Sequence, residues 1–350
     1  MNQWHGCYDD GWQGLIVPEA FAHPAKMAYG LTMRIFKHAL SEAWIKPGDV
    51  VVDPFGGIGS TGLVGSALGL RVVCVELEQK FVDLGKANFE KHSAAIDAFH
   101  HFGHSYQPVI IQGDSRKLSE VIAGADCVVS SPPYAESDTS MSHGSGTSRT
   151  DPNNKNYRPY AVRNLEKHES KRDYGQTPGN LGNLKPGKVS AVIGSPPYTP
   201  DALGHGGKPT KMAKEKALHA ALNNAQYGQT EGNLGNGNND TFWQAAKQIV
   251  SECHKILKPQ GIAIWVVKAF VRKGKLVDFP GDWQRLCEAQ GFQTVCVHHA
   301  MLVKETTHNG LFEDITVKKE RKSFFRRLAE SKGSPAIDYE TVLCMKKDCA

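Results

Sequence analysis

The sequence lacks any pair of cysteines spaced as Cys-X-X-Cys, the usual signature of a zinc ribbon or a dithiol redox site. Cys74 and Cys127 lie in apolar runs typical of buried strands, so we interpret them as small buried side chains in a reducing compartment. The cluster of His100, His101 and His104 has no partners at ligand spacing, so we expect no metal site. The eight cysteines are scattered at Cys7, Cys74, Cys127, Cys253, Cys287, Cys296, Cys344 and Cys349.

The sequence also lacks an apolar run of membrane-spanning length, and its first residues lack the basic-then-apolar pattern of a secretory signal. We therefore expect no membrane partner and a cytoplasmic location. A strong charge excess is absent too. The formal net charge of +5 over 350 residues is compatible with a polyanionic partner but does not identify one.

Apolar runs alternate with amphipathic segments over much of the chain. Short apolar or strand-like runs predict strands at residues 50–52, 71–75, 108–111, 126–129, 189–193, 262–267, 292–298 and 341–345. Helical spacing predicts helices at residues 27–43, 60–68, 80–91, 118–122, 242–257 and 283–289, with a turn at 258–261. This alternation predicts a doubly wound α/β sheet, mostly parallel.

Composition divides the chain into three parts. Residues 1–134 and 241–350 carry the α/β pattern, whereas residues 135–240 are rich in Gly, Asn, Ser, Lys and Pro. We interpret the middle part as a long polar insertion whose basic side chains could follow phosphates, or alternatively as a solvated surface loop.

The middle part contains most of an internal repeat. Residues 128–134 read Val-Val-Ser-Ser-Pro-Pro-Tyr, and residues 192–198 read Val-Ile-Gly-Ser-Pro-Pro-Tyr. A Tyr-Gly-Gln-Thr segment follows each copy, at residues 174–177 and 227–230. Two matches in the same order indicate that one strand-loop unit was duplicated.

The loop after the first strand has the composition of a nucleotide-binding turn. Asp53 ends the strand, and Gly57 and Gly59 let the backbone turn tightly and approach a ligand before the next helix. Glu76 ends the second strand, where a carboxylate can accept hydrogen bonds from a ribose diol. Asp114 ends the third strand and could accept an adenine amine or, alternatively, act as a helix N-cap.

The two Ser-Pro-Pro-Tyr tetrapeptides suit the binding of a planar amine. Consecutive prolines fix the backbone and remove two N–H donors, so the carbonyls of Ser131 and Pro132 are rigid acceptors. Tyr134 offers a flat face for stacking a heterocycle. The alternative is a proline-stiffened turn in which the tyrosine only packs.

These motifs resemble those of the amino-group DNA methyltransferases that make N4-methylcytosine or N6-methyladenine. The resemblance implies a Rossmann-like methyltransferase sheet and S-adenosylmethionine as cofactor. It implies catalytic roles for Ser131, Pro132, Pro133 and Tyr134, with Ser195, Pro196, Pro197 and Tyr198 as the alternative copy. The cofactor-binding residues that it implies are His23, Pro24, Lys26, Asp53, Pro54, Phe55, Gly57, Gly59, Thr61, Glu76 and Asp114.

Serine at the first tetrapeptide position implies cytosine N4 in that family, with adenine N6 as the alternative. The resemblance further implies double-stranded DNA as partner, with the target base flipped out of the stack. It places the protein in the cytoplasm of a prokaryotic or phage-infected cell, in restriction and modification, and leaves a companion nuclease undetermined. An RNA or protein amide methyltransferase and an inactive DNA-binding protein remain open.

Overall fold

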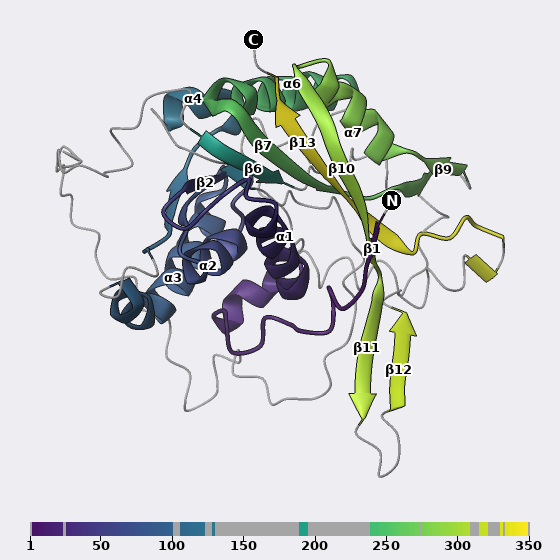
Figure 1. Ribbon diagram of the computed structural model, residues 1–350, viewed down its shortest axis with the longest axis horizontal. Coiled ribbons are helices and arrows are strands. Elements are labelled where there is room, and N and C mark those ends of the chain that lie inside the picture. The colour runs from purple at the N-terminus through teal and green to yellow at the C-terminus, as the bar shows by residue number, and fades with distance from the viewer. Residues whose placement is uncertain are drawn as a thin grey trace, which may run out of the picture.

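A computed structural model gives the architecture of the chain (Figure 1). The structure describes residues 2–23, 26–100, 106–122, 128–129, 189–194, 239–272, 275–308, 315–320, 330–331 and 333–348. Both Ser-Pro-Pro-Tyr tetrapeptides, Pro24 and most of the polar part lie outside these residues. The division of the chain at residues 134 and 240 therefore stays a prediction.

One large sheet forms the centre of the molecule. Strands β4, β3, β2, β6 and β7 are all parallel, and β13 runs antiparallel to both of its neighbours, β7 and β10. The order along the sheet is β1 (Asn2–Trp4), β10 (Phe292–Met301), β13 (Tyr339–Lys347), β7 (Leu257–Val267), β6 (Val189–Gly194), β2 (Val50–Asp53), β3 (Arg71–Glu76) and β4 (Val109–Gln112), with β5 (Val128–Val129) also paired to β6. This topology confirms the predicted doubly wound, mostly parallel sheet.

Helices cover both faces of the sheet (Figure 1). One layer holds α1 (Tyr29–Ser41), α2 (Ser60–Ala67) and α3 (Gln79–His100), and the other holds α4 (Leu118–Val121), α6 (Asn239–Ile256) and α7 (Phe279–Glu288). The helix α1 illustrates why these segments form amphipathic helices. Its apolar residues Leu31, Ile35 and Ala39 recur every four positions, and all three are buried on one face of the helix.

The strand order reverses between β2 and β6. From β2 the chain proceeds outward to β3 and β4, whereas β6 leads outward in the other direction to β7. Val52 of β2 lies opposite Val192 of β6 in the parallel register. In open α/β sheets a ligand binds beyond the carboxyl ends of the strands at such a reversal. We therefore expect a ligand site among the residues that follow β2, β3 and β6.

The structure differs from the sequence predictions in four places. The turn predicted at residues 258–261 lies within β7, although Gln260 has a left-handed φ of 64° and the register with β6 shifts there. The helix predicted at 80–91 continues to His100. The strand predicted at residues 189–193 is confirmed as β6, but its place in the middle of the sheet was not predicted. Two hairpins were not predicted, namely β8 (Phe270–Arg272) with β9 (Lys275–Val277) and β11 (Val303–His308) with β12 (Ile315–Glu320).

Two short 3-10 helices, η1 (Pro18–Ala22) and η2 (Ser115–Lys117), flank the region beyond β2 and β4. Among the described residues, no helix has both the length and the apolar character needed to cross a membrane.

Candidate active site

The loop after β2 requires glycine at several positions, because of its backbone angles and its close packing. Gly57 and Gly59 have φ angles of 52° and 77°, in the left-handed region that favours glycine. A Cβ on Gly56 would stand 2.7 Å from the Cβ of Cys74, and one on Gly59 would stand 2.5 Å from the ring of Phe89. The loop is thus packed closely against β3 and α3, and neither position has room for a side chain.

Asp53 organises this loop from within. Its side chain is buried, and one carboxylate oxygen accepts the Phe55 N–H at 2.9 Å while the other accepts the Thr61 hydroxyl at 2.5 Å. The carboxylate therefore connects the end of β2 to the first turn of α2. The carbonyl of Pro54 accepts a hydrogen bond from the Ser115 hydroxyl, which joins the loop to η2.

Glu76 connects the loop to the neighbouring strand. Its carboxylate accepts the Gly57 N–H and the Glu78 N–H, each at 2.9 Å. Burial raises the pKa of Glu76 to about 7, although the hydrogen bonds from Glu78 and Gly57 act in the opposite direction. Each carboxylate oxygen keeps a lone pair beyond the one these bonds use. The group can therefore accept further donors from a ligand.

The structure brings His23 and Lys26 to the same side of the molecule. His23 is buried with its ring edge-on to Phe81 at 4.3 Å, and a Cβ on Gly57 would stand 3.3 Å from the His23 ring. Burial lowers the pKa of His23 to about 3, assisted by Lys26 and Lys80, so the ring is neutral near pH 7. The Lys26 ammonium donates to the backbone carbonyls of Phe21 and His23.

Asp114 has the geometry of the N-cap alternative. Its carboxylate accepts the Arg116 N–H at 2.9 Å at the start of η2 and also pairs with the Arg116 guanidinium. Although burial raises the pKa of Asp114, these interactions outweigh it and hold the pKa below its usual value. The structure therefore confirms the N-cap, and the role toward an adenine ring stays a prediction.

The strands before the two tetrapeptides lie side by side. Val128 pairs with Val192 and Val129 pairs with Ile193, which is the alignment of the sequence repeat itself. Ser131 and Ser195 each follow two residues after the last paired position. The two tetrapeptides lie outside the described residues, and the paired residues Val129 and Ile193 that precede them lie at the same level in the sheet.

Asn88 is a structural residue of the site that the sequence analysis missed. It is fully buried within α3, accepts the Val17 N–H at 2.8 Å, and donates to the carbonyl of Ile58 at 2.9 Å. Its side chain therefore connects both the N-terminal segment and the glycine loop to α3 by hydrogen bonds. The available signal was an amide on the apolar stripe of that helix, beside Phe89.

The sequence matches the family of N6 and N4 methyltransferases described as DNA methylase over residues 5–87. Over 52 residues the chain is 46% identical to the Type II methyltransferase M.HinfI of Haemophilus influenzae. That alignment covers 15% of this chain and 14% of the relative, so the chain spans only a small part of the relative's length.

Solved methyltransferase structures resemble the chain over most of its length. TrmN from Thermus thermophilus is 12% identical, with a TM-score of 0.38 over 94% of this chain and 52% of that one. A TehB-like SAM-dependent methyltransferase from Corynebacterium glutamicum is 10% identical, with a TM-score of 0.33 over 92% and 98%. The strand order described above gives the fold, and the similarity to the DNA methylase family of N6 and N4 methyltransferases covers residues 5–87.

Proposed function

We propose that this protein is an S-adenosylmethionine-dependent DNA methyltransferase that modifies an exocyclic amino group of a base. The observation that carries the proposal is the glycine loop after β2, hydrogen-bonded to Glu76 at the end of β3, at the reversal of strand order. The family match includes both of these features, because it spans residues 5–87.

The residues present fit an adenosyl cofactor. Gly57 and Gly59 allow the tight turn of the loop beyond the end of β2, and the Glu76 carboxylate can accept the two hydroxyls of a ribose. His23 and Lys26 lie beside the same loop and are the residues of this chain that we assign to the methionine end. When bound, S-adenosylmethionine supplies a methyl group already activated on a sulfonium.

The tetrapeptide is assigned to the target amine. An exocyclic amine is a poor nucleophile because its lone pair is delocalised into the ring. Serine and proline carbonyl acceptors on its N–H groups favour a pyramidal nitrogen whose lone pair forms the new N–C bond. On transfer, the electron pair of the S–C bond would stay on sulfur, and the extra proton on nitrogen would be lost to solvent.

The place of β6 supports the second tetrapeptide as the catalytic copy. The order of motifs along the sequence favours Ser131–Tyr134, which follows Asp114 through a short helix and a strand. However, β6 runs directly into Ser195, and it occupies the position between β2 and β7, beside the cofactor loop. We therefore assign Ser195, Pro196, Pro197 and Tyr198 to the target amine, and Ser131–Tyr134 to the DNA-binding face.

Serine at the first position of both copies favours cytosine N4 over adenine N6. The partner that we propose is double-stranded DNA with the target base flipped, since a stacked base cannot reach a crevice at the sheet edge. The Type II name of the Haemophilus relative supports a place in restriction and modification.

The substrate class can be tested by the transfer of labelled methyl groups. The protein is incubated with labelled S-adenosylmethionine and, separately, with unmodified double-stranded DNA, with RNA, and with a protein extract freed of nucleic acid. We expect label in DNA alone. Label in RNA or protein in place of DNA would support the RNA or amide methyltransferase alternative, and cofactor binding without transfer to any of them would support an inactive DNA-binding protein.

A further inference from the structure

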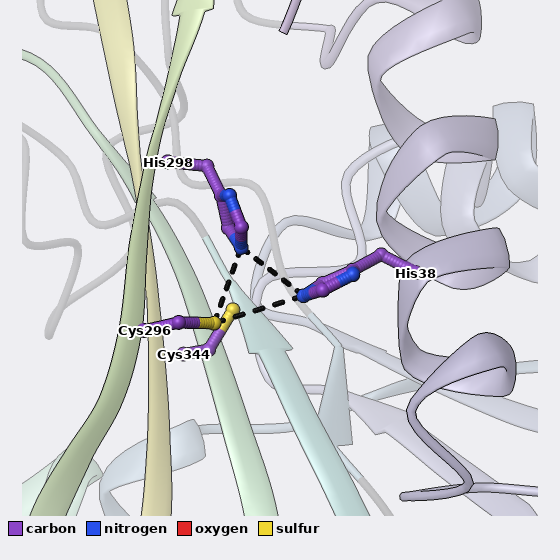
Figure 2. A group of neighbouring side chains, drawn as sticks. All are labelled: His38, Cys296, His298 and Cys344. Carbon is purple, nitrogen blue, oxygen red and sulfur yellow. Dashed lines mark hydrogen bonds between the residues drawn. The ribbon is translucent and has the colours of Figure 1, made fainter. Parts of the chain in front are cut away.

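Four potential metal ligands from three distant parts of the chain meet at one point. They are His38 of α1, Cys296 and His298 of β10, and Cys344 of β13, and their ligand atoms all lie within 4.8 Å of one another. Figure 2 shows the two histidine rings and the two sulfurs directed at a common centre between α1 and the strands. The cluster is unrelated to any motif used for the proposed function.

The strand register brings together three of the four ligands. Cys296 and Cys344 are directly opposite each other in the antiparallel pair β10–β13. His298 lies two residues after Cys296 and therefore on the same face of β10. These three ligands are thus fixed by the sheet itself and do not depend on a loop.

A β-bulge turns these side chains toward α1. The register between β10 and β13 shifts between Thr294 and Cys296, which leaves Val295 as the extra residue. Before the bulge, the Thr294 hydroxyl bonds to Glu288 of α7, whereas after it Cys296 contacts His38 of α1 on the opposite face. The bulge therefore changes which helix layer the alternate residues of β10 face.

Hydrogen bonding alone accounts poorly for the spacing. The His298 Nε2 stands 3.1 Å from both the His38 Nε2 and the Cys296 Sγ, and the latter two atoms are 3.6 Å apart. A neutral imidazole nitrogen either donates one proton or accepts one, so it cannot satisfy several such neighbours at once. A tetrahedral cation bound at about 2.0–2.3 Å would hold its ligand atoms roughly 3.3–3.8 Å apart and use every lone pair.

The surroundings are those of a closed site. Cys344 and His298 are buried, and the Trp4 ring stacks on His298 at 4.3 Å while Trp44 meets His38 edge-on at 5.0 Å. The Glu42 carboxylate stands 3.9 Å from the other ring nitrogen of His38. A carboxylate near the outer nitrogen of a ligating imidazole is a common feature of zinc sites, and here the separation is longer than a hydrogen bond.

We propose that His38, Cys296, His298 and Cys344 form a structural zinc site that joins α1 to the C-terminal strands β10 and β13. Two thiolates and two imidazoles at tetrahedral spacing are the ligand set that zinc prefers, and four protein ligands leave no open position for catalysis. The bound ion would cross-link residues more than 250 positions apart in the sequence. It would therefore hold α1 against β10 and β13.

The full chain tests the proposal directly. It is purified without a metal-affinity step, dialysed against metal-free buffer, and its zinc is measured by plasma mass spectrometry against protein concentration. We expect about one zinc ion per chain, and a lower melting temperature after prolonged treatment with a chelator, restored by added zinc. A chain without stoichiometric zinc that also fails to take up zinc after chelation would overturn the proposal.

Matched variants locate the ion. Cys344→Ala and Cys296→Ala are expected to lose at least about tenfold in zinc affinity. The control is Cys287→Ala, because Cys287 is equally buried but lies outside the cluster, and it is expected to keep the ion. Zinc that both cluster variants retain would place the ion elsewhere and contradict the assignment.

If the variants fail to fold, substitution of cobalt(II) into the wild-type chain tests the metal site. Chelated protein reconstituted with cobalt(II) should show the intense visible bands of a tetrahedral ion together with thiolate-to-cobalt charge transfer. Their absence would contradict the proposal. A Cys296–Cys344 disulfide found by mass spectrometry in chain kept under reducing conditions would also overturn it, in favour of a cross-strand bond.

Discussion

The backbone N–H of Gly57 donates a 2.9 Å hydrogen bond to the carboxylate of Glu76. This bond joins the loop after β2 to the end of β3, and so combines the two parts of the proposed cofactor site into one unit. It uses one lone pair of the carboxylate and the Glu78 N–H uses another, so each oxygen keeps a lone pair for a further donor. The predictions below follow from this arrangement and from the strand order around it.

Replacing Glu76 with Gln should weaken S-adenosylmethionine binding by roughly 10- to 100-fold, because an amide offers one oxygen in place of two charged acceptors. Calorimetric titration measures this directly. The matched control is Glu90→Gln on the exposed side of α3, for which we expect an unchanged dissociation constant. Equal affinity for the two variants would remove Glu76 from the cofactor site.

Cofactor binding by the wild-type protein should depend on pH. Burial raises the pKa of Glu76 to about 7, so the carboxyl group takes up a proton as the pH falls below 7. The protonated form is a poorer acceptor for a diol, and the affinity should therefore fall from pH 8 to pH 6. Glu76→Gln has no such group and should show a flatter profile. A wild-type profile that is flat over this range would contradict the assigned role.

Thr61→Val should destabilise the fold by about 1–3 kcal/mol, because it removes the hydroxyl that donates a hydrogen bond to the buried carboxylate of Asp53. Thr61→Ser keeps the hydroxyl and should recover most of that loss. Urea denaturation followed by circular dichroism measures both. If the serine variant is as unstable as the valine variant, the packing of the methyl group and not the hydrogen bond supports the loop.

Gly57→Ala should weaken cofactor binding more than its backbone strain alone explains. A side chain at φ 52° costs about 1–2 kcal/mol, and its Cβ would also meet the ring of His23. Gly14→Ala is the control, since Gly14 has a φ of 77° with no atom within 4 Å of a built Cβ. We expect similar losses of stability in the two variants, but a rise of roughly 10-fold or more in the cofactor dissociation constant for Gly57→Ala alone. Equal affinities would show that the loop backbone does not face the ligand.

Much of the fold follows from local sequence, because its central strands are short apolar runs such as residues 50–52 bounded by clear turn residues. The loop at Asp53–Gly59 and the acid Glu76 were predictable for the same reason, since each ends such a strand. The order of strands in the sheet could not be predicted from local sequence. It depends on pairing between distant segments, and the central place of β6 could not be obtained from the polar composition around it.

The cluster around His38 was missed for a related reason. Sequence rules for metal sites look for ligands a few residues apart, and only Cys296 and His298 are neighbours in the chain. Cys344 lies opposite Cys296 only through the register of β10 and β13. The face to which Cys296 and His298 point depends on a one-residue bulge in β10. The N-cap of Asp114 was predictable, but its pairing with the Arg116 guanidinium depends on a side-chain conformation that the sequence does not determine.

The two tetrapeptides can be distinguished by paired substitutions. Ser195→Ala with Tyr198→Ala should abolish methyl transfer, whereas Ser131→Ala with Tyr134→Ala should retain transfer and weaken DNA binding. Rates are compared at saturating cofactor, with affinity for DNA measured by anisotropy. Loss of transfer in the first-copy variant alone would assign catalysis to Ser131–Tyr134, as the sequence analysis favoured.

The most direct test of the central proposal is the identity of the methylated base. Unmodified double-stranded DNA is incubated with the protein and S-adenosylmethionine, digested to nucleosides, and analysed by mass spectrometry. We expect N4-methylcytosine. N6-methyladenine would keep the reaction class and correct the base, and DNA without any methylated amino group, under conditions in which the protein binds its cofactor, would contradict the proposed function.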